Sequence, residues 1–511
     1  MAAIPTRLAP RTALPLTVLL GAMVLTGCAS MTPIALTGGD LKQQAQADRA
    51  TARRNVPPIT AALGLEEAIA RALKYNLDRR ARMMEEALAL NAFEAGKYDM
   101  LPKLVASAGY RSRNEDLITR SIDSVTGAPS LANPAISSER NHSNADLGLT
   151  WNLLDFGLSY YGAQQNADRL LIATERRRKA MHILIQDVRT AFWRTASSQK
   201  LRADITTTIT LAESALDDSR QAETERLRSP IDALRFQRQL LDNLRQLETI
   251  DQELSTARID LAGLINAPLD SNLTVIEPAD LMKQKMLSWS ITAMEDTALA
   301  QNADLREQNY NVRIAGIETR KAMTRLFPNL SFNDTLRYDS DKYMVNNHWN
   351  EAGLQLSFNL FNLLSAPSQL RLAEAGIALA DQRRVTTQMA VLTQMHVARL
   401  QYASAVRQYQ RADTIWQVDD RIRQHVANRA SVEVQSKLEA VSNDTAAILS
   451  QLRRYQTLAQ LHAAASRLQA TLGMEPAIGD VQTTPLAQLT DEVAGSLKRW
   501  SEGELAATAK P

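Results

Sequence analysis

The sequence contains little cysteine, few aromatic residues and no excess of either charge. Its 511 residues include one cysteine, 19 glycines and 17 prolines, and aromatic residues make up 5%. One cysteine excludes an internal disulfide, and so few glycines and prolines do not fit a turn-rich sandwich or barrel. Lysine and arginine total 58 against 56 acidic residues, so the basic excess typical of nucleic-acid binding is missing. The composition favours long helices.

Motifs for catalysis and metal binding are missing as well. The sequence has no phosphate-binding loop, no nucleophile elbow, no HExxH zinc motif and no GxGxxG. No histidine lies within a helical turn of another, which excludes a local histidine pair for a metal. The adjacent Met83 and Met84 fit packing better than soft-metal contact. We expect no enzymatic activity, no catalytic residues, no cofactor and no metal.

The N-terminus has the pattern of an export signal. Arg7 and Arg11 precede an apolar stretch that is too short for an ordinary membrane-spanning helix. The stretch ends in Leu25-Thr26-Gly27-Cys28, which resembles the bacterial lipobox. We predict a signal peptide over residues 1–27, lipidation of Cys28 and a linker over 28–58; the alternative is an ordinary secretory signal with a chance cysteine. By resemblance to lipoprotein sorting, Ala29 and Ser30 after the cysteine favour the outer membrane.

An internal repeat organises the remaining chain. Short motifs recur at similar offsets: Leu101-Pro102 as Phe327-Pro328, Asn76 as Asn302, and Pro268 as Pro476. The repeat predicts a first half over residues 59–268 and a second over 291–476, with a connection at 269–290 and a tail at 477–511. Each half is expected to contain a helix, two strands, a very long helix, a tight turn and a returning helix. Residues near 118–140 predict an exposed loop.

Four segments alternate between apolar and polar residues, which predicts strands at about 103–112, 144–154, 329–338 and 351–361. Each is about nine residues long, the length of a tilted membrane strand. A soluble, half-buried hairpin alternates in the same way and remains the alternative. In the membrane interpretation, four side chains should face lipid: Leu149, Trp151, Leu356 and Phe358.

The segments after the strands predict unusually long helices. Neither glycine nor proline occurs between Gly162 and Pro230, and leucines at 240, 247, 254 and 261 recur once per heptad. A sustained period of 3.5 predicts coiled-coil packing. A helix of about 70 residues would be roughly 105 Å long, which matches two shorter helices stacked beside it.

Four strands per chain cannot close a barrel, and open sheet edges are not tolerated in lipid. Two chains would supply eight strands, whose interior is filled by side chains, whereas three would supply twelve and leave a lumen. The simplest assembly with a pore is therefore a trimer.

These features together resemble the outer-membrane factor family, the TolC-like channels of efflux and secretion systems, and its lipoprotein branch. The resemblance rests on Leu65-Glu66-Glu67-Ala68, on the Leu-Pro and Phe-Pro motifs before the strands, and on Leu153-Leu154-Asp155-Phe156-Gly157 and Leu360-Phe361-Asn362 after them. It implies a mainly α fold with a small β part: a trimeric twelve-stranded outer-membrane β-barrel, four strands per chain, continuous with a long periplasmic α-helical coiled-coil barrel, and an internal duplication.

The resemblance also implies a function. The chain would conduct substrate passively across the outer membrane, in a tripartite system with a periplasmic membrane-fusion adaptor and an inner-membrane pump. The chain would form a homotrimer, contact outer-membrane lipid and bind no nucleic acid. The alternative is a non-channel periplasmic coiled-coil adaptor or structural lipoprotein, although an adaptor would usually show β-domains flanking a single coiled hairpin.

The two helix turns are the candidate periplasmic gate and adaptor contact. Arg228 precedes Asp232, and Arg429 precedes Glu433, by four residues in both halves. The second turn resembles the family's arginine followed by Val-Asp-Val, where ionic links between helix pairs hold the channel closed. The alternative is helix capping and an exposed ion pair worth roughly 0.3–0.5 kcal/mol. The usual glycine of these turns is missing here.

Overall fold

The computed structural model describes residues 35–120, 122–129, 135–225, 229–269, 272–278, 285–430 and 437–504. The predicted signal peptide and Cys28 lie outside these residues. The chain divides into two compact units at residues 55 and 56. In the first unit, helix α2 (Gly38–Arg53) begins at Thr37, whose side chain accepts a hydrogen bond from the Asp40 amide in a capping box. The side chains of α2 are exposed, apart from a half-buried Ala52.

The second unit contains the remaining helices and strands. Its first half runs α3 (Leu65–Tyr75), α4 (Leu77–Tyr98), β1 (Lys103–Ser112), β2 (Leu117–Thr119), β3 (Ala135–Ser138), β4 (Asn141–Asn152), α5 (Leu153–Thr224), α6 (Pro230–Ser255) and α7 (Ala257–Leu264). After a 3-10 turn at Lys285–Ser288, its second half runs α8 (Ile291–Gln301), α9 (Ala303–Thr324), β5 (Asn329–Asp339), β6 (His348–Ser357), α10 (Phe361–Ala430), α11 (Lys437–Thr471) and α12 (Leu486–Glu502).

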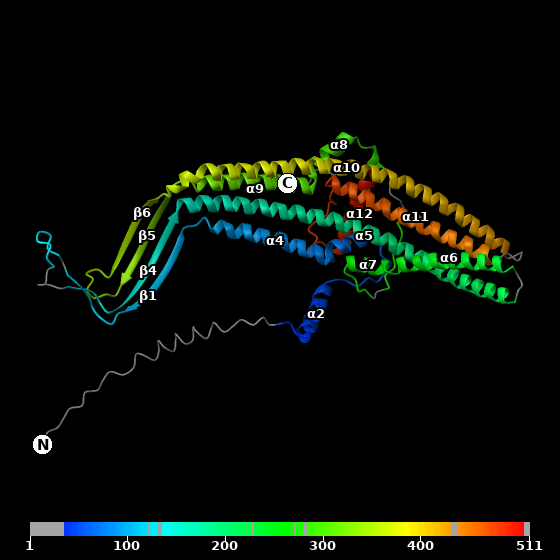
Figure 1. Ribbon diagram of the computed structural model, residues 1–511, viewed down its shortest axis with the longest axis horizontal. Helices are drawn as coiled ribbons and strands as arrows, with labels where there is room; N and C mark the ends of the chain where they lie inside the picture. The colour runs from blue at the N-terminus through cyan, green and yellow to red at the C-terminus, as the bar shows by residue number, and fades with distance from the viewer. Residues whose placement is uncertain are drawn as a thin grey trace, which may run out of the picture. The chain divides into compact units, whose positions relative to one another are not determined.

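Two very long helices form the frame of this unit. Helix α5 has 72 residues and α10 has 70, so each is roughly 105–110 Å long. Along α5, α4 and α9 pack beside the part near the strands, and α6, α7 and α11 pack beside the rest (Figure 1). The expected arrangement of one long helix beside shorter stacked ones is therefore present. None of the described helices is both long enough and apolar enough to cross a membrane.

The heptad positions predicted from the sequence form the helix interfaces. Leu240, Leu247 and Leu254 of α6 and Leu261 of α7 are all at most 4% exposed. Leu247 and Leu254 pack in one cluster with residues of α5 and α11, so the two helical hairpins share a core. On α10, residues at the same kind of spacing are also buried: Met395, Ala398, Tyr402, Ala405, Tyr409 and Ala412. Burying this apolar surface is the main driving force for the bundle.

Two asparagines that the sequence repeat aligns have equivalent contacts. The Asn76 side chain accepts a hydrogen bond from the Arg79 amide at the start of α4, and its Nδ2 donates to the Leu264 carbonyl. The Asn302 side chain accepts from two amides at the start of α9, and its Nδ2 donates to the Thr471 carbonyl. Each asparagine thereby caps one helix and ties it to the end of the returning helix.

Gly473 follows α11 at a position that only glycine fits. Its φ is +71°, and a Cβ there would stand 2.3 Å from the Gln301 carbonyl oxygen. Both the left-handed backbone and the close approach exclude a side chain. The guanidinium of Arg178 reaches the same carbonyl and that of Gly473, which joins α5 to the end of α8 and the end of α11.

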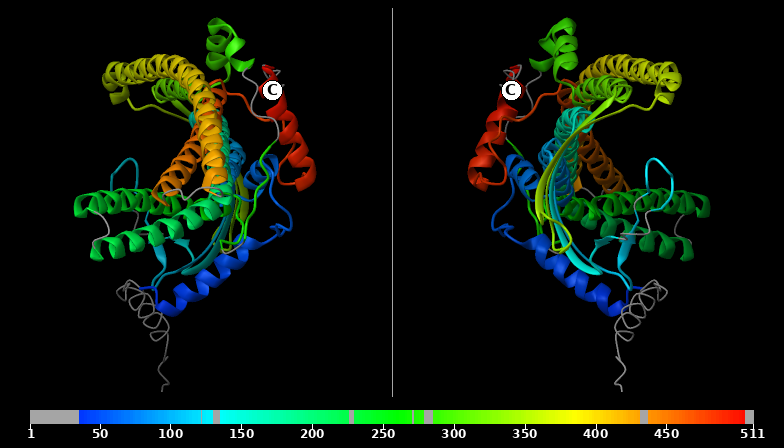
Figure 2. Two further views of the ribbon diagram at one scale, coloured as in Figure 1. Left: turned by 90° about the vertical axis from the view of Figure 1, so that its right-hand side faces the viewer. Right: turned by 90° about the vertical axis from the view of Figure 1, so that its left-hand side faces the viewer.

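Four strands form one antiparallel sheet with the order β1-β4-β5-β6. Figure 2, which views the unit along its helices, shows them as one curved layer. A second sheet pairs β2 with β3 inside the segment that the sequence predicts as an exposed loop. The β-strand content is small, and the fold is mainly helical, as predicted.

Several boundaries differ from the predicted ones. Helix α5 begins at Leu153, directly after β4, and β6 ends at Ser357 although a strand was expected to about 361. The returning helix expected in the first half is divided at Thr256 into α6 and α7. The predicted tail contains α12, which packs on α3 and buries an apolar stripe of Leu489, Val493 and Trp500.

Candidate functional site

The four-stranded sheet has one apolar and one polar face. Residues paired directly across antiparallel strands project from the same face. The register aligns Trp151 with Phe332 and Leu354, and it aligns Leu147 with Ala106 and Leu336, all on one face. The other face carries the alternate residues, which include Ser107, Asp146, Thr150, Asn333, Arg337, Glu351 and Gln355.

Three of the four residues predicted to face lipid lie on the apolar face. Leu149 and Trp151 are in β4, and Leu356 in β6 pairs with Leu330. Trp151 is 42% exposed and Leu356 is 70% exposed, which is unusual for large apolar side chains. Phe358 follows the last residue of β6, so the register does not assign it to a face. Trp151 also stacks edge-on against Phe156 of α5.

The polar face carries paired and unpaired charges. Arg337 of β5 and Glu351 of β6 form an ion pair of 3.3 Å, and both are more than 40% exposed. Ser107 donates a hydrogen bond of 3.5 Å to Asp146, the residue opposite it on β4. Such a face suits water rather than lipid.

Strands β1 and β6 are the edges of this sheet, and neither has a second strand partner among the described residues. Both edges are ten residues long and exposed along nearly their whole length. An exposed edge of this length is a template for pairing with another chain. Both edges of the sheet therefore present backbone groups without a strand partner among the described residues.

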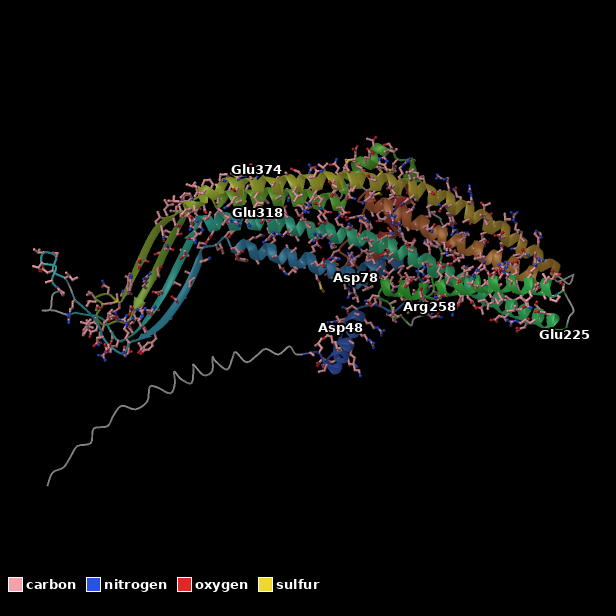
Figure 3. The ribbon with its side chains drawn as sticks, in the orientation of Figure 1. Asp48, Asp78, Glu225, Arg258, Glu318 and Glu374 are labelled. Atoms are coloured by element: carbon pink, nitrogen blue, oxygen red, sulfur yellow. The ribbon has the colours of Figure 1, made fainter. Side chains whose placement is uncertain are left out.

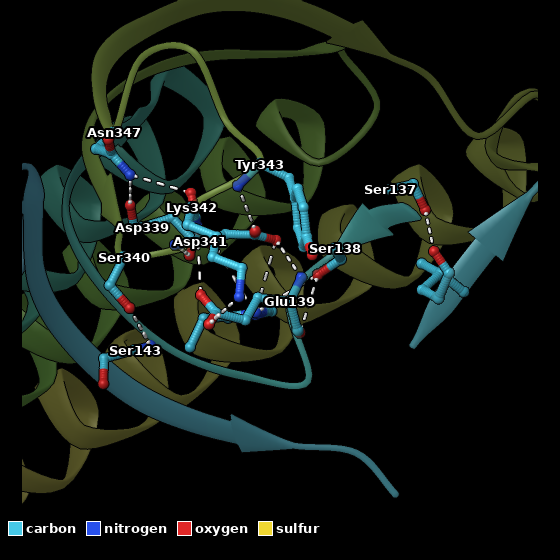
Figure 4. A network of polar contacts seen from close by, with 12 residues as sticks. Ser137, Ser138, Glu139, Ser143, Asp339, Ser340, Asp341, Lys342, Tyr343 and Asn347 are labelled. Atoms are coloured by element: carbon cyan, nitrogen blue, oxygen red, sulfur yellow. Dashed lines mark hydrogen bonds and ion pairs between the residues drawn. The ribbon is translucent and has the colours of Figure 1, made fainter. Parts of the chain in front are cut away.

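A polar network connects the loops at the end of the sheet away from the helices (Figure 4). Asp341, which is 3% exposed, accepts hydrogen bonds from the amides of Glu139 and Tyr343. Lys342 forms an ion pair of 3.2 Å with Glu139, and the Ser143 amide donates to the Ser340 hydroxyl. The network fastens the segment before β4 to the β5–β6 turn. No short sequence pattern marks this network, because its members are far apart in the chain.

The hairpin tips hold the predicted gate residues, and only part of this prediction lies within the described residues. Asp232 lies in the first turn of α6, after Ser229 as N-cap and Pro230 as first residue, but Ser229 makes no side-chain capping bond. Asp232 forms a 3.9 Å pair with Arg235, and both are largely exposed. Arg228, Glu433 and the side chain of Arg429 lie outside the described residues. Glu225, at the end of α5, marks this end of the bundle (Figure 3).

Buried polar side chains occupy the middle of the helical unit. Arg189 of α5 is 1% exposed, and its guanidinium donates to the Ser466 hydroxyl and, at 3.2 Å, to Gln469 of α11. His462 stacks on Trp193 with the ring centroids 5.0 Å apart. Burial, and then the charge of Arg189, lowers the pKa of His462 to about 3. Burial, and then Arg178, lowers the pKa of His182 to about 4.

Because the pKa values of these two buried histidines are lowered, we predict that the protein loses stability in mild acid. Their folded-state pKa values are below the unfolded value of about 6.5, so the unfolded chain binds more protons below that pH. The contribution of the two histidines to the free energy of unfolding is fully present above pH 6.5 and falls as the pH drops toward their folded-state pKa values. At pH 5.5 each histidine should lower the free energy of unfolding by about 1.4 kcal/mol relative to neutral pH.

Denaturant unfolding at pH 7.5 and pH 5.5 measures this loss. The variant His462→Phe keeps an aromatic ring beside Trp193 and removes one titrating group. Its loss of unfolding free energy between pH 7.5 and pH 5.5 should therefore be about half that of the wild type. An unchanged difference in this variant would show that other groups cause the acid sensitivity.

Comparison with solved structures relates this geometry to known proteins. No protein-family model and no curated protein sequence matches the chain. The Campylobacter jejuni CmeC outer membrane channel matches with a TM-score of 0.64 and 13% identity, over 84% of this chain and 89% of CmeC. The open state of the Neisseria gonorrhoeae MtrE outer membrane channel matches with a TM-score of 0.57 and 16% identity, over 80% and 89%.

The Vibrio cholerae outer membrane protein VceC matches with a TM-score of 0.59 and 14% identity, over 80% of this chain and 97% of VceC. The chain has the fold of outer-membrane channels. The resemblance seen in the sequence is thereby confirmed at the level of the fold.

Proposed function

We propose that the chain is a subunit of an outer-membrane channel that conducts substrate passively out of the periplasm. The observation that carries this proposal is the four-stranded sheet with an apolar face, a polar face and two unpaired edges, at one end of two very long helical hairpins. An apolar outer surface meets lipid, and a polar inner surface meets the aqueous lumen. The likeness to solved outer-membrane channels supports the same function.

The sheet closes when β6 of one copy pairs with β1 of the next. Three copies give twelve strands and leave a lumen, whereas two would give a barrel filled by side chains. Closure also satisfies the edge amides and carbonyls, which cannot remain unpaired in lipid. The helical hairpins of the three copies then continue the lumen into the periplasm.

The tips of the hairpins are the proposed contact with a periplasmic adaptor and, through it, an inner-membrane pump. Helices α5 and α10 carry these tips to the end farthest from the sheet (Figure 1). We propose that Arg228 with Asp232, and Arg429 with Glu433, close the channel through ionic links between neighbouring hairpins. The Asp232–Arg235 pair gives Asp232 a partner on its own helix, so the second tip is the stronger candidate for the gate.

Purified protein in planar lipid bilayers tests the proposed function. We expect stepwise ion currents under an applied voltage without ATP or any pump, because the pore is passive. Because the proposed tip links would hold the wild type closed, the variant Arg429→Ala with Glu433→Gln is measured as well. If neither protein carries a current under any voltage although both insert into the bilayer, the alternative of a structural lipoprotein is favoured. Protein that does not insert at all would exclude a membrane barrel.

Replacement of Cys28 by alanine tests the proposed lipid anchor. The variant should lack acyl chains and keep its uncleaved signal peptide, because the modified cysteine directs cleavage. The barrel should still hold the protein in the membrane, since acyl chains add to an existing spanning structure. Mass spectrometry of the mature N-terminus decides the question, and an unmodified wild-type terminus that starts at another residue contradicts the anchor.

A further inference from the structure

His142 lies between two aspartates at the end of the sheet away from the helices. It is 5% exposed, and its Nε2 is 4.0 Å from the carboxylate of Asp339, while its Nδ1 is 3.8 Å from that of Asp341. Asp341 is buried as well. Each ring nitrogen of this buried histidine therefore faces a different carboxylate.

The three side chains come from segments that are far apart in the chain. His142 is the second residue of β4, and Asp339 is the last residue of β5. Asn144 pairs with Asp339, and His142 is two residues from Asn144, so both His142 and Asp339 belong to the polar face. Asp341 follows in the β5–β6 turn. A stronger contact among the three would fasten the start of β4 to that turn.

The protonation of His142 determines how strong this contact is. A neutral imidazole has one N–H, so it can donate to only one of the two carboxylates. Its other nitrogen then presents a lone pair to oxygen atoms, where the Ser138 hydroxyl, 3.5 Å from Nδ1, can donate. A protonated imidazole has an N–H toward each carboxylate and a positive charge between two negative ones. Both distances are longer than a hydrogen bond, and a movement of about 1 Å would complete each bond.

Further charged groups lie on the segments that adjoin His142: Arg111 on β1, Arg113, Glu115 and Asp116 before β2, Glu139 and Arg140 before β4, and Lys342 in the β5–β6 turn. Two ion pairs form among them, Glu139 with Lys342 at 3.2 Å and Arg140 with Asp116 at 2.8 Å. Arg111 lies opposite His142, and its charge opposes protonation of the ring. Imidazole is the only side chain of these types that ordinarily changes its charge between pH 5 and 8.

We propose that His142, Asp339 and Asp341 form a proton-binding site that fastens the outer mouth of the channel in acid. When the ring takes a proton from water, its two N–H groups donate to the two carboxylates, and the start of β4 is held against the β5–β6 turn. When the ring is neutral, this contact is weaker and the two segments move more freely. The inference rests on the proposed function, in which the polar face lines the lumen and this end of the sheet opens to the outside.

Acid acts on this site in the opposite direction to its action on His182 and His462. Those two histidines are buried near arginines, so protonation destabilises the helical unit. His142 is buried between carboxylates, so protonation strengthens its contacts. Because a measurement of global unfolding would combine the two effects, the test needs a local measurement at the end of the sheet.

Hydrogen exchange measured by mass spectrometry gives such a local measurement. The amides of Glu139 and Tyr343 both donate to Asp341, so the peptides that contain them report on the two sides of the contact (Figure 4). The protection of these peptides in the full-length protein is compared with the intrinsic exchange rate at each pH. It should be about tenfold higher at pH 5.5 than at pH 8.

Three variants identify the group that senses the pH. His142→Gln keeps a polar side chain that cannot gain a charge, so its protection should not depend on pH. Asp339→Asn removes one of the two carboxylates and should leave a difference of about threefold. The matched control is His348→Gln, which removes an exposed histidine opposite Tyr338 on the other face of the sheet and should keep the full difference. Each variant should show the oligomeric mass of the wild type.

Two results would overturn the inference. If the wild type is equally protected at both pH values, protonation does not fasten these segments. If His142→Gln or Asp339→Asn keeps the full pH dependence, another group is the sensor. Bilayer currents in either case leave the proposed function standing without this site. Absence of currents, in the tip variant as well, contradicts the proposed function, while the exchange data still decide whether His142 binds the proton.

Discussion

A lysine in place of Ala106 should destabilise the membrane-inserted protein by about 2–4 kcal/mol per subunit, because it puts a charge near the middle of the lipid-facing band. Ala106 shares a row with Leu147 and Leu336, between the row of Trp151 and that of Tyr338. A trimer carries three such lysines, so the total cost should be roughly 6–12 kcal/mol. That is comparable to the whole stability of many proteins, and assembly in the membrane should fail.

The matched control is Ser107→Lys, one residue farther along β1. Ser107 projects from the polar face beside Asp146, so its lysine should be tolerated in the lumen. Leu149 is a poorer position for this test, because a lysine there would stand opposite Asp334. The amount of heat-stable oligomer in isolated outer membranes measures the outcome. Equal tolerance of both lysines would mean that the sheet is a soluble, half-buried hairpin.

The double variant Arg429→Ala with Glu433→Gln should open the channel. It removes three of the six proposed links in a trimer, and exposed ion pairs contribute roughly 0.2–1 kcal/mol each. The ratio of open to closed channels should then rise roughly threefold to 150-fold. Higher single-channel open probability and faster leakage of antibiotics into cells would both report this change.

The control is an arginine–glutamate ion pair that lies away from the hairpin tips. Arg82 and Glu85 form an exposed ion pair of 2.8 Å on α4, and the variant Arg82→Ala with Glu85→Gln changes charge in the same way. It should leave the currents unchanged. The gate assignment is wrong if the tip variant also behaves like the wild type while its oligomer stays intact, and the charges are then helix caps.

The sequence predicted those features that a short-range pattern determines. Strand alternation predicted which residues share a face, because the side-chain period of a strand is two and one face is apolar. The heptad leucines predicted the buried side of α6 because a helix repeats every 3.6 residues. The paired motifs around Asn76 and Asn302 predicted equivalent positions, and both residues cap helices in the same way.

Features that depend on long-range packing were not predicted. The break at Thr256 has no glycine or proline to mark it, and the leucine spacing continues across it. The partners of Arg189 come from α11, nearly 280 residues later in the chain. Helix α12 did carry a signal, since Leu489, Val493 and Trp500 recur at helical spacing.

Imaging of the purified protein in lipid nanodiscs tests the central claim most directly, namely that this sheet is one third of a closed membrane wall. The account predicts threefold particles in which twelve strands form one barrel inside the lipid, with a lumen that continues between the long helices. Particles whose sheet closes within a single chain, or whose strands lie outside the lipid while only helices associate, would contradict it.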